Sequence, residues 1–263
     1  MVIPAFNEAP AICHVVEDLF RLRVCQQCEM YIHEASDTQA SGVRCCCNTD
    51  CKNSSLCSYS AQLIDQIVVC DNASTDDTAA LAASCGAIVT HEQEQGYGAA
   101  CLAALAVPIE KDIVVFVDGD NSVVATELPC LVDPLYCGAD LVVGSRTMGN
   151  TEKGALSVPQ QFGNKLASFL VRTLWSSDVT DLGPFRATTH AVLADLQMTD
   201  RQFGWTVEMQ VKALQKDKVM VEVPVSTRQR LGKSKISGTV RGVVCRGVIT
   251  NYNLVYKLSR IRT

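Results

Sequence analysis

A short apolar run that ends in two carboxylates constrains the fold of this chain more than any other feature. Residues 113–117 are five apolar, mostly β-branched residues, and Asp118-Gly119-Asp120 follows them directly. The run is too short to cross a membrane and too apolar for a surface strand, so it predicts a buried strand of a parallel sheet. In open α/β sheets, ligands bind at the carboxyl ends of the strands. Asp118 and Asp120 therefore stand where a ligand would bind.

The acidic pair allows two interpretations. Strand alternation aims Asp118 and Asp120 the same way, and Gly119 allows a ligand or a backbone to approach closely. Such paired carboxylates suit a divalent cation that is also held by phosphate oxygens. Alternatively, the motif is an Asp-Gly turn whose carboxylates cap the next helix. The motif alone leaves both interpretations open.

The same pattern of an apolar run followed by polar residues recurs in the first half of the chain. It predicts further strands at residues 1–4, 66–70, 87–90 and 140–144, with helices at 9–22, 76–85, from 96 onwards and at 128–135. Alternation of strands and helices predicts a parallel, doubly wound sheet. Polar side chains gather at the predicted strand ends, which favours the ligand interpretation: Asn7, Glu8, Asp71, Asn72, Asp118, Asp120 and Arg146.

The second half departs from this alternation. Residues 159–174 predict an amphipathic helix with Phe162, Leu166, Phe169, Leu170 and Leu174 on one face. A polar turn at 178–186 ends in Arg186. A helix at 203–215, a strand at 219–225 and a final helix from about residue 238 complete the prediction.

The distribution of charge points to an anionic partner for one end of the chain. The net charge is −5, yet residues 225–263 hold nine Lys or Arg and no acid. Phosphate of a small ligand or anionic lipid headgroups suit such a segment, whereas the acidic body would repel nucleic acid. We find neither an apolar run of about 18 residues nor a signal peptide at residues 1–8. We therefore predict a cytoplasmic protein, at most peripheral to a membrane.

Residues 23–62 interrupt the pattern and contain half of the 14 cysteines. A stretch of this length without periodicity is unusual inside a compact domain, so we interpret it as a disordered insertion. Two further interpretations stay open. One is a zinc site, formed by Cys25, Cys28, the run Cys45-Cys46-Cys47, Cys51, Cys57 and His33, although the spacing matches no established zinc pattern. The other is a sequence artefact such as retained non-coding translation.

Six motifs, taken in order, resemble those of family 2 glycosyltransferases with a GT-A fold. The resemblance is greatest to the polyprenyl-phosphate sugar synthases, the dolichyl-phosphate mannose and glucose synthases. The motifs occupy residues 2–8, 71–76, 118–120, 144–146, 181–186 and 232–239. Apart from the insertion at 23–62, the resemblance covers nearly the whole chain. It implies one GT-A domain over residues 1–263, with a mostly parallel central sheet flanked by helices and a basic C-terminal helix at 237–263.

The resemblance also implies a role for individual residues. The donor, a nucleotide-sugar similar to UDP-glucose or GDP-mannose, would be bound at Pro4, Ala5, Asn7, Glu8, Asp71, Asn72, Gly98 and Gly119, with Asp71 on the base. Asp118 and Asp120 would hold Mg²⁺ or Mn²⁺ together with the diphosphate, because a metal neutralises the charge that develops on this leaving group. Cations suited to phosphates are Arg146, Arg186, Arg230, Lys233 and Lys235.

The acceptor depends on whether a general base exists. An inverting transfer to a hydroxyl needs a carboxylate to take its proton, and Thr206 stands where many family members carry that aspartate. Glu208 and Asp181 are the remaining candidates, although Glu208 has a purely structural alternative. A phosphate acceptor is already ionised, so the missing base and the basic C-terminal segment favour a polyprenyl phosphate. Alternatives are a soluble hydroxyl acceptor and a non-catalytic zinc- or nucleotide-binding protein, whereas residues 4–8 lack the Gly-rich basic loop of a nucleotidyltransferase.

Overall fold

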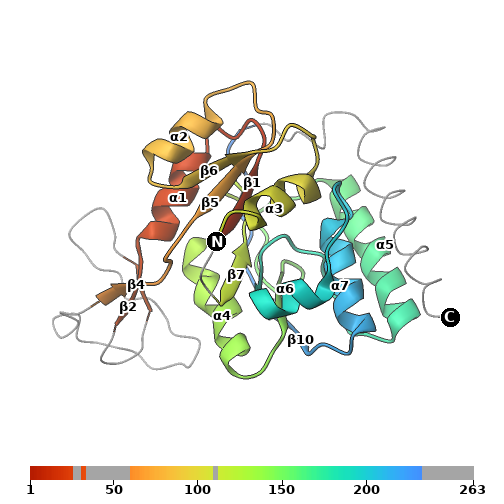
Figure 1. Cartoon of the computed structure of the whole chain (residues 1–263). Coiled ribbons are helices and arrows are strands. Elements are labelled where there is room, and N and C mark those ends of the chain that lie inside the picture. The colour runs from red at the N-terminus through yellow and green to blue at the C-terminus, as the bar shows by residue number, and fades with distance from the viewer. Residues whose placement is uncertain (26–30, 34–59, 109–111, 233–263) are drawn as a thin grey trace.

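The structure, a computed structural model, describes residues 1–25, 31–33, 60–108 and 112–232. Its centre is a seven-stranded sheet of strand order β10-β8-β9-β7-β1-β5-β6 (Figure 1). The strands of this sheet are β1 (Val2–Ala5), β5 (Val68–Asp71), β6 (Ile88–His91), β7 (Ile113–Phe116), β8 (Leu141–Ser145), β9 (Arg186–Thr189) and β10 (Met220–Pro224). The helices are α1 (Ile12–Phe20), α2 (Thr78–Ser84), α3 (Tyr97–Leu105), α4 (Leu128–Tyr136), α5 (Val158–Trp175), α6 (His190–Leu196) and α7 (Trp205–Gln215).

The sheet is parallel except for one strand. β1 pairs in parallel with β5 and β7, β5 with β6, and β8 with β10, whereas β9 is antiparallel to both β7 and β8. This arrangement confirms the mostly parallel α/β sheet predicted from the sequence. It also brings the carboxyl ends of β1, β5, β7 and β8 to the same edge, where Asp71, Asp118 and Arg146 follow their strands.

The sequence did not predict β9 or α6. We expected a polar turn that ends in Arg186, because Arg186-Ala187-Thr188-Thr189 contains no apolar run. The structure inserts these residues between β7 and β8, where Arg186, Ala187 and Thr188 are fully buried. Hydrogen bonds to two neighbouring strands, rather than local hydrophobicity, therefore fix this strand.

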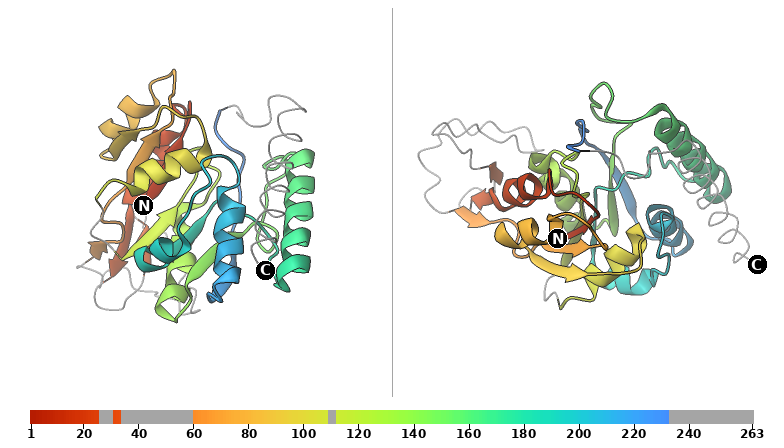
Figure 2. Two further views of the ribbon diagram at one scale, coloured as in Figure 1. Left: turned by 45° about the vertical axis from the view of Figure 1, so that its right-hand side comes forward. Right: turned by 90° about the horizontal axis from the view of Figure 1, so that it is seen from above.

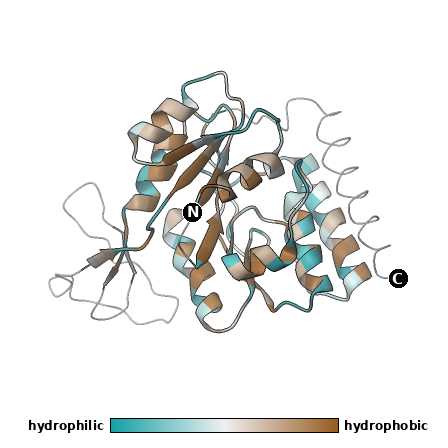
Figure 3. Cartoon of the chain, viewed as in Figure 1, coloured by the Kyte–Doolittle hydropathy of each residue, from teal (hydrophilic) through white to brown (hydrophobic). Residues whose placement is uncertain are grey.

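Helices cover both faces of the sheet (Figures 1 and 2). On one face, Ile3, Val69 and Val115 pack with the buried sides of α1, α2 and α4. On the other, Val2, Val68, Phe116 and their neighbours pack with α3, α6 and α7, and Phe116 meets Trp205 edge to face at 6.0 Å between ring centroids. The strands between these layers are the most hydrophobic part of the chain (Figure 3).

The predicted insertion at 23–62 lies partly within the described residues. There it forms a small antiparallel sheet of β2 (Leu22–Cys25), β3 (Tyr31–His33) and β4 (Ser60–Gln62), with β2 in the centre. These strands correct the prediction of a disordered insertion for the residues they contain. The cysteines from Cys28 to Cys57 and the predicted C-terminal helix at 237–263 lie outside the described residues.

Helix α5 forms as predicted but presents part of its apolar face to solvent. Its capping box at Ser157 and Gln160 fixes the helix start, and Ala167, Val171 and Trp175 pack against Val207 and Val211 of α7. The opposite side carries large exposed side chains: Val158 (78% exposed), Phe162 (66%) and Phe169 (54%). In the part of the chain that the structure describes, no helix has the length and apolarity needed to cross a membrane.

Candidate functional site

Asp118 and Asp120 lie at the boundary between two cavities. One cavity, of about 270 Å³, lies over the ends of β1 and β5, and the other, of about 390 Å³, extends toward the N-terminus of α5. Asp118, Asp120 and Arg230 line both cavities. A group bound in one cavity would thus face a group in the other across the two carboxylates, which is the arrangement that a transfer reaction needs.

The first cavity contains much of the predicted donor site. Its lining includes Pro4, Ala5, Glu8, Asn72 and Gly119, all of them predicted from the sequence. The lining is completed by Phe6, Gly96, Tyr97 and Ala100 and by three residues that the sequence analysis did not connect with the donor: Gln95, Gln202 and Phe203. The last two come from the loop before α7, far from the other residues in sequence, so the sequence alone gave no signal that they meet β1.

The second cavity combines acidic, basic and apolar residues in its lining. Arg146 lies there with Asp118, Asp120 and Arg230, and residues 154–157 and Gln160 from the start of α5 form one wall. The described chain ends at Gly232 in the same lining. This cavity therefore connects the acidic pair to the helix with the exposed apolar face.

Burial and the neighbouring charge of Asp120 disfavour the ionised form of Asp118. Burial raises the pKa of Asp118 to about 7, and the charge of Asp120 adds to this effect. The Tyr97 hydroxyl donates a 3.1 Å hydrogen bond to Oδ1 of Asp118. Burial also raises the pKa of Tyr97 well above its usual range, so its hydroxyl remains a donor at neutral pH.

A divalent cation fits this donor set. Two neighbouring carboxylates offer hard oxygen ligands, and a cation between them would relieve the repulsion that raises the pKa of Asp118. The described residues contain no group of three or more His, Cys, Asp or Glu side chains that could hold a metal ion by themselves. Asp118 and Asp120 would therefore share the cation with oxygens of a bound ligand, as Mg²⁺ sites with phosphates do.

Asp181 is paired too tightly to serve as a general base. It is fully buried, and its two oxygens accept hydrogen bonds from Nη2 (2.7 Å), Nε (2.8 Å) and the backbone N–H (2.7 Å) of Arg146. Burial favours its neutral form, but Arg146 outweighs burial and lowers the pKa of Asp181. This geometry favours a role in which Asp181 orients Arg146 over the predicted role of a catalytic base.

Glu208 is likewise committed to a structural contact. It is 1% exposed and accepts hydrogen bonds from the backbone N–H and hydroxyl of Thr199 and from the Asp200 N–H, and it forms a 2.8 Å ion pair with Lys212. Burial acts to raise the pKa of Glu208, but these contacts, with Lys212 first among them, lower it. The structure therefore favours the structural alternative over the base.

Arg186 does not reach either cavity. Its guanidinium is fully buried beneath the site and donates to the carbonyl oxygens of Gly183 and Thr206, the latter at 3.0 Å. Burial lowers its pKa to about 10. This position favours a structural role over the predicted catalytic one, because the buried guanidinium of Arg186 joins the turn before β9 to the start of α7.

Three predicted donor-binding residues are not part of the lining of the first cavity. They form hydrogen bonds within the protein instead. Asn7, with φ of 53°, accepts from the Thr75 N–H through Oδ1 at 2.8 Å. Asp71 accepts from the Ser74 N–H and contacts His91 at 3.2 Å. The Gly98 N–H, predicted to meet a ligand, donates instead to the Gln202 carbonyl at 2.9 Å.

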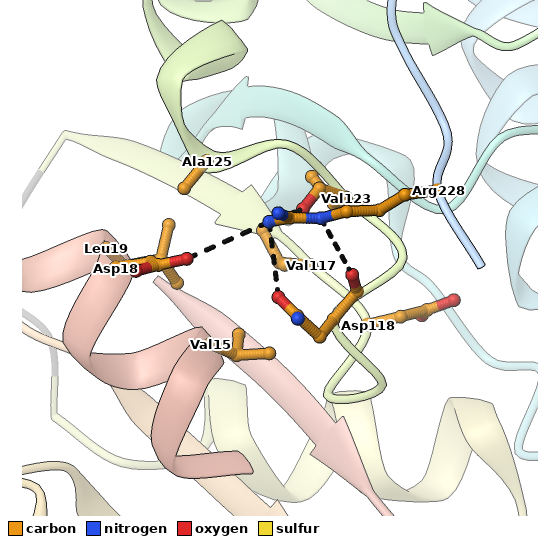
Figure 4. A pocket seen from close by; sticks show the side chains of 9 residues that line it. Val15, Asp18, Leu19, Val117, Asp118, Val123, Ala125 and Arg228 are labelled. Atoms are coloured by element: carbon orange, nitrogen blue, oxygen red, sulfur yellow. Dashed lines mark hydrogen bonds and ion pairs between the residues drawn. The ribbon is translucent and has the colours of Figure 1, made fainter. Parts of the chain in front are cut away.

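The basic segment that follows β10 closes over the acidic pair. Arg228 lies against α1 and the loop after β7, donating to Asn121 and Val123 (Figure 4). Arg230 reaches Glu8 at 2.6 Å and Asp120 at 3.5 Å, and its Nε is buried without a hydrogen-bond partner among the described residues. The Arg230 side chain is nevertheless 24% exposed and lines both cavities, so its guanidinium can face a bound phosphate, while Lys233 and Lys235 lie outside the described residues.

Comparison with known proteins gives a consistent set of relatives. Residues 53–196 match the sequence profile described as "Glycosyl transferase family 2". An uncharacterized glycosyltransferase of Mycobacterium tuberculosis is 39% identical over 180 residues, which is 67% of this chain and 80% of that protein. A dolichyl-phosphate hexose transferase of Haloferax volcanii is 32% identical over 175 residues, covering 64% of this chain and 73% of that one.

A solved structure shares the fold. Glucosyl-3-phosphoglycerate synthase from Mycobacterium tuberculosis, crystallised with Mn²⁺, UDP-glucose and phosphoglyceric acid, superposes with a TM-score of 0.64 over 97% of this chain and 78% of its own. The two sequences are 19% identical. At this identity the likeness establishes a common fold, and it confirms the GT-A architecture expected from the sequence.

Proposed function

The chain belongs to glycosyl transferase family 2, and from that premise we propose that it transfers a hexose from a nucleotide-sugar to a polyprenyl phosphate, with inversion and with the help of Mg²⁺ or Mn²⁺. The observation that carries this proposal is the position of Asp118 and Asp120 between two cavities. One cavity would take the donor and the other the acceptor.

The donor side follows from the first cavity. Pro4, Ala5, Asn72 and Phe203 are among the residues of its lining, and this mixture of polar and apolar residues suits a nucleoside. The diphosphate would extend toward Asp118 and Asp120. There a bound cation would neutralise the charge that develops on the leaving nucleoside diphosphate.

The acceptor side follows from the second cavity. Arg146 is held by Asp181, and both Arg146 and Arg230 line this cavity, so two guanidinium groups can bind an acceptor phosphate near the reacting centre. Asp181 and Glu208 are both engaged in buried contacts. A phosphate needs no base, so the arrangement supports a phosphate acceptor over a hydroxyl acceptor.

The exposed side of α5 supports a lipid-linked acceptor. Val158, Phe162 and Phe169 are spaced by four and seven residues, which places them on one side of the helix, and exposed Lys165 and Arg172 flank them. Large exposed apolar side chains bordered by basic ones suit the surface of an anionic membrane. Because the second cavity opens beside the start of α5, a phosphate in the headgroup layer would lie near Arg146.

The experiment is a transfer assay with the full chain, Mn²⁺, UDP-[¹⁴C]glucose or GDP-[¹⁴C]mannose, and either polyprenyl phosphate in anionic vesicles or soluble hydroxyl acceptors. We expect metal-dependent transfer of label into the organic phase. Asp120→Asn should abolish the transfer, and Asp217→Asn, an exposed aspartate in the turn after α7, should not. Label that enters only the soluble acceptors would contradict the lipid acceptor.

A second arm tests the membrane surface separately. The double variant Phe162→Ser/Phe169→Ser should float poorly with anionic vesicles and lose transfer to the lipid. Its stabilisation by Mn²⁺ and donor should persist, because both side chains lie outside the cavities. The matched control is Tyr136→Ser on α4, which is 77% exposed. Equal flotation of the double variant and the wild type would exclude α5 as the membrane-binding surface.

A further inference from the structure

We propose that Tyr97 is a positioning residue for the metal site, an inference that rests on the proposed function of Asp118. The Tyr97 hydroxyl donates to Oδ1 of Asp118 at 3.1 Å. Tyr97 is the first residue of α3 and lines the first cavity beside Gly96. A hydrogen bond to one carboxylate oxygen fixes the rotamer of that carboxylate before a cation arrives.

Tyr97 can do this because the start of α3 is fixed against a loop from the other half of the chain. The N–H groups of Gly98 and Ala99 donate to the carbonyls of Gln202 and Arg201 at 2.9 and 2.8 Å. The approach is so close that a Cβ at Gly96 would lie 2.1 Å from the Arg201 oxygen, and one at Gly98 would lie 2.0 Å from the Asp200 oxygen. Glycine on both sides of Tyr97 is therefore required for this contact.

The loop at 199–204 is itself braced from within. Glu208 accepts from the N–H groups of Thr199 and Asp200. Asp200 in turn accepts from the N–H groups of Gln202 and Gly204 at 2.8 and 3.1 Å. The loop carbonyls that accept hydrogen bonds from the start of α3 are thus held at fixed positions.

A second brace acts from the opposite side of Tyr97. The Asn72 amide donates to the carbonyls of Glu92 and Glu94 at 3.0 and 2.7 Å, and its oxygen accepts from the Gly96 N–H at 2.8 Å. Arg201 also pairs with Glu92 and Glu94. The tyrosine therefore stands between two networks, one of which contains the predicted base Glu208 and the other the predicted donor residue Asn72.

If Tyr97 orients Asp118, removal of the Tyr97 hydroxyl should lower the affinity for the metal more than it lowers kcat. Partners that orient a metal ligand contribute roughly 10–100-fold to metal affinity. Tyr97→Phe keeps the ring and its packing but releases the Asp118 carboxylate. The apparent dissociation constant for Mn²⁺ should rise about tenfold or more, whereas kcat at saturating Mn²⁺ should stay within about threefold.

The test measures Mn²⁺ binding directly, by the electron paramagnetic resonance signal of free Mn²⁺ with UDP or GDP present, alongside the Mn²⁺ dependence of transfer. The matched control is Tyr136→Phe, whose ring is 77% exposed on α4. An unchanged Mn²⁺ affinity for Tyr97→Phe, or a fall in kcat with unchanged affinity, would overturn the proposal. Failure of the proposed function would give a different result from failure of this proposal. The wild-type protein would then bind Mn²⁺ in the resonance measurement but transfer no sugar in the assay.

Discussion

Substitution of Glu208 by glutamine separates a structural carboxylate from a catalytic one. The wild-type side chain accepts hydrogen bonds from Thr199 and Asp200 and pairs with Lys212 at 2.8 Å. Glutamine keeps the shape and one acceptor, but its NH₂ group would face an N–H donor or the Lys212 ammonium. The charge of Lys212 would also lose its partner.

The magnitude follows from the burial of the pair. Breaking a buried ion pair by removal of one partner costs roughly 3–5 kcal/mol. Lys212 is 17% exposed and glutamine still accepts one hydrogen bond, so we expect a loss of about 2–3 kcal/mol in the free energy of unfolding. With an m-value of about 2–3 kcal/mol/M, the urea midpoint should fall by roughly 1 M.

The assay combines urea unfolding with steady-state transfer below the unfolding transition. We expect kcat of Glu208→Gln to stay within about tenfold of wild type, because loss of a general base costs about 10²–10⁴ and the residue is not acting as one. Glu17→Gln in α1 is the control, since its pair with Arg21 is exposed and such pairs contribute less than about 1 kcal/mol. A hundredfold loss of kcat with an unchanged urea midpoint would refute the structural role.

Four further predictions concern charged groups in and around the site. The pKa of Asp118 is about 7, and a cation needs the ionised carboxylate. The Mn²⁺ affinity measured by calorimetry should therefore fall about tenfold per pH unit below pH 7 and level off above it. An affinity that does not change with pH would contradict the raised pKa. The folded protein also binds this proton more tightly than the unfolded chain, so the metal-free protein should lose stability as pH rises from about 4 to 7, and melting curves of Asp118→Asn should show a smaller loss. Arg186→Met should destabilise the fold by about 2–4 kcal/mol, because the carbonyls of Gly183 and Thr206 lose their hydrogen-bond donor. The folded fraction should still bind the nucleotide-sugar. A loss of nucleotide-sugar affinity without a loss of stability would indicate that Arg186 contacts the ligand. Asp181→Asn should raise the KM for the acceptor through misplacement of Arg146 and leave kcat within about tenfold, whereas loss of kcat alone would identify a base.

Sequence reasoning succeeded where local pattern decides structure. Apolar runs such as 113–117 predicted the parallel strands, and the polar residues after them predicted the edge of the sheet at which the two cavities lie. The same reasoning could not find β9, because Arg186-Ala187-Thr188-Thr189 becomes a strand only through the two strands beside it.

The site was harder to predict, since several polar residues serve the fold rather than the ligand. Asp181, Arg186 and Glu208 carry the charges expected of catalytic groups, but burial and local partners engage each of them. Conversely, Gln202 and Phe203 line the first cavity, although the sequence connected the neighbouring Thr206 and Glu208 only with the acceptor. Only the packing of the loop before α7 onto α3 brings them there.

The central claim is that Asp118 and Asp120 bind a cation together with the diphosphate of a nucleotide-sugar. Titration calorimetry of UDP-glucose and GDP-mannose, with and without Mn²⁺, tests it on wild type and on Asp120→Asn. We predict that one donor binds wild type in a Mn²⁺-dependent manner and that Asp120→Asn loses this dependence while it retains the fold. Mn²⁺-dependent donor binding of equal strength in both proteins would contradict the account.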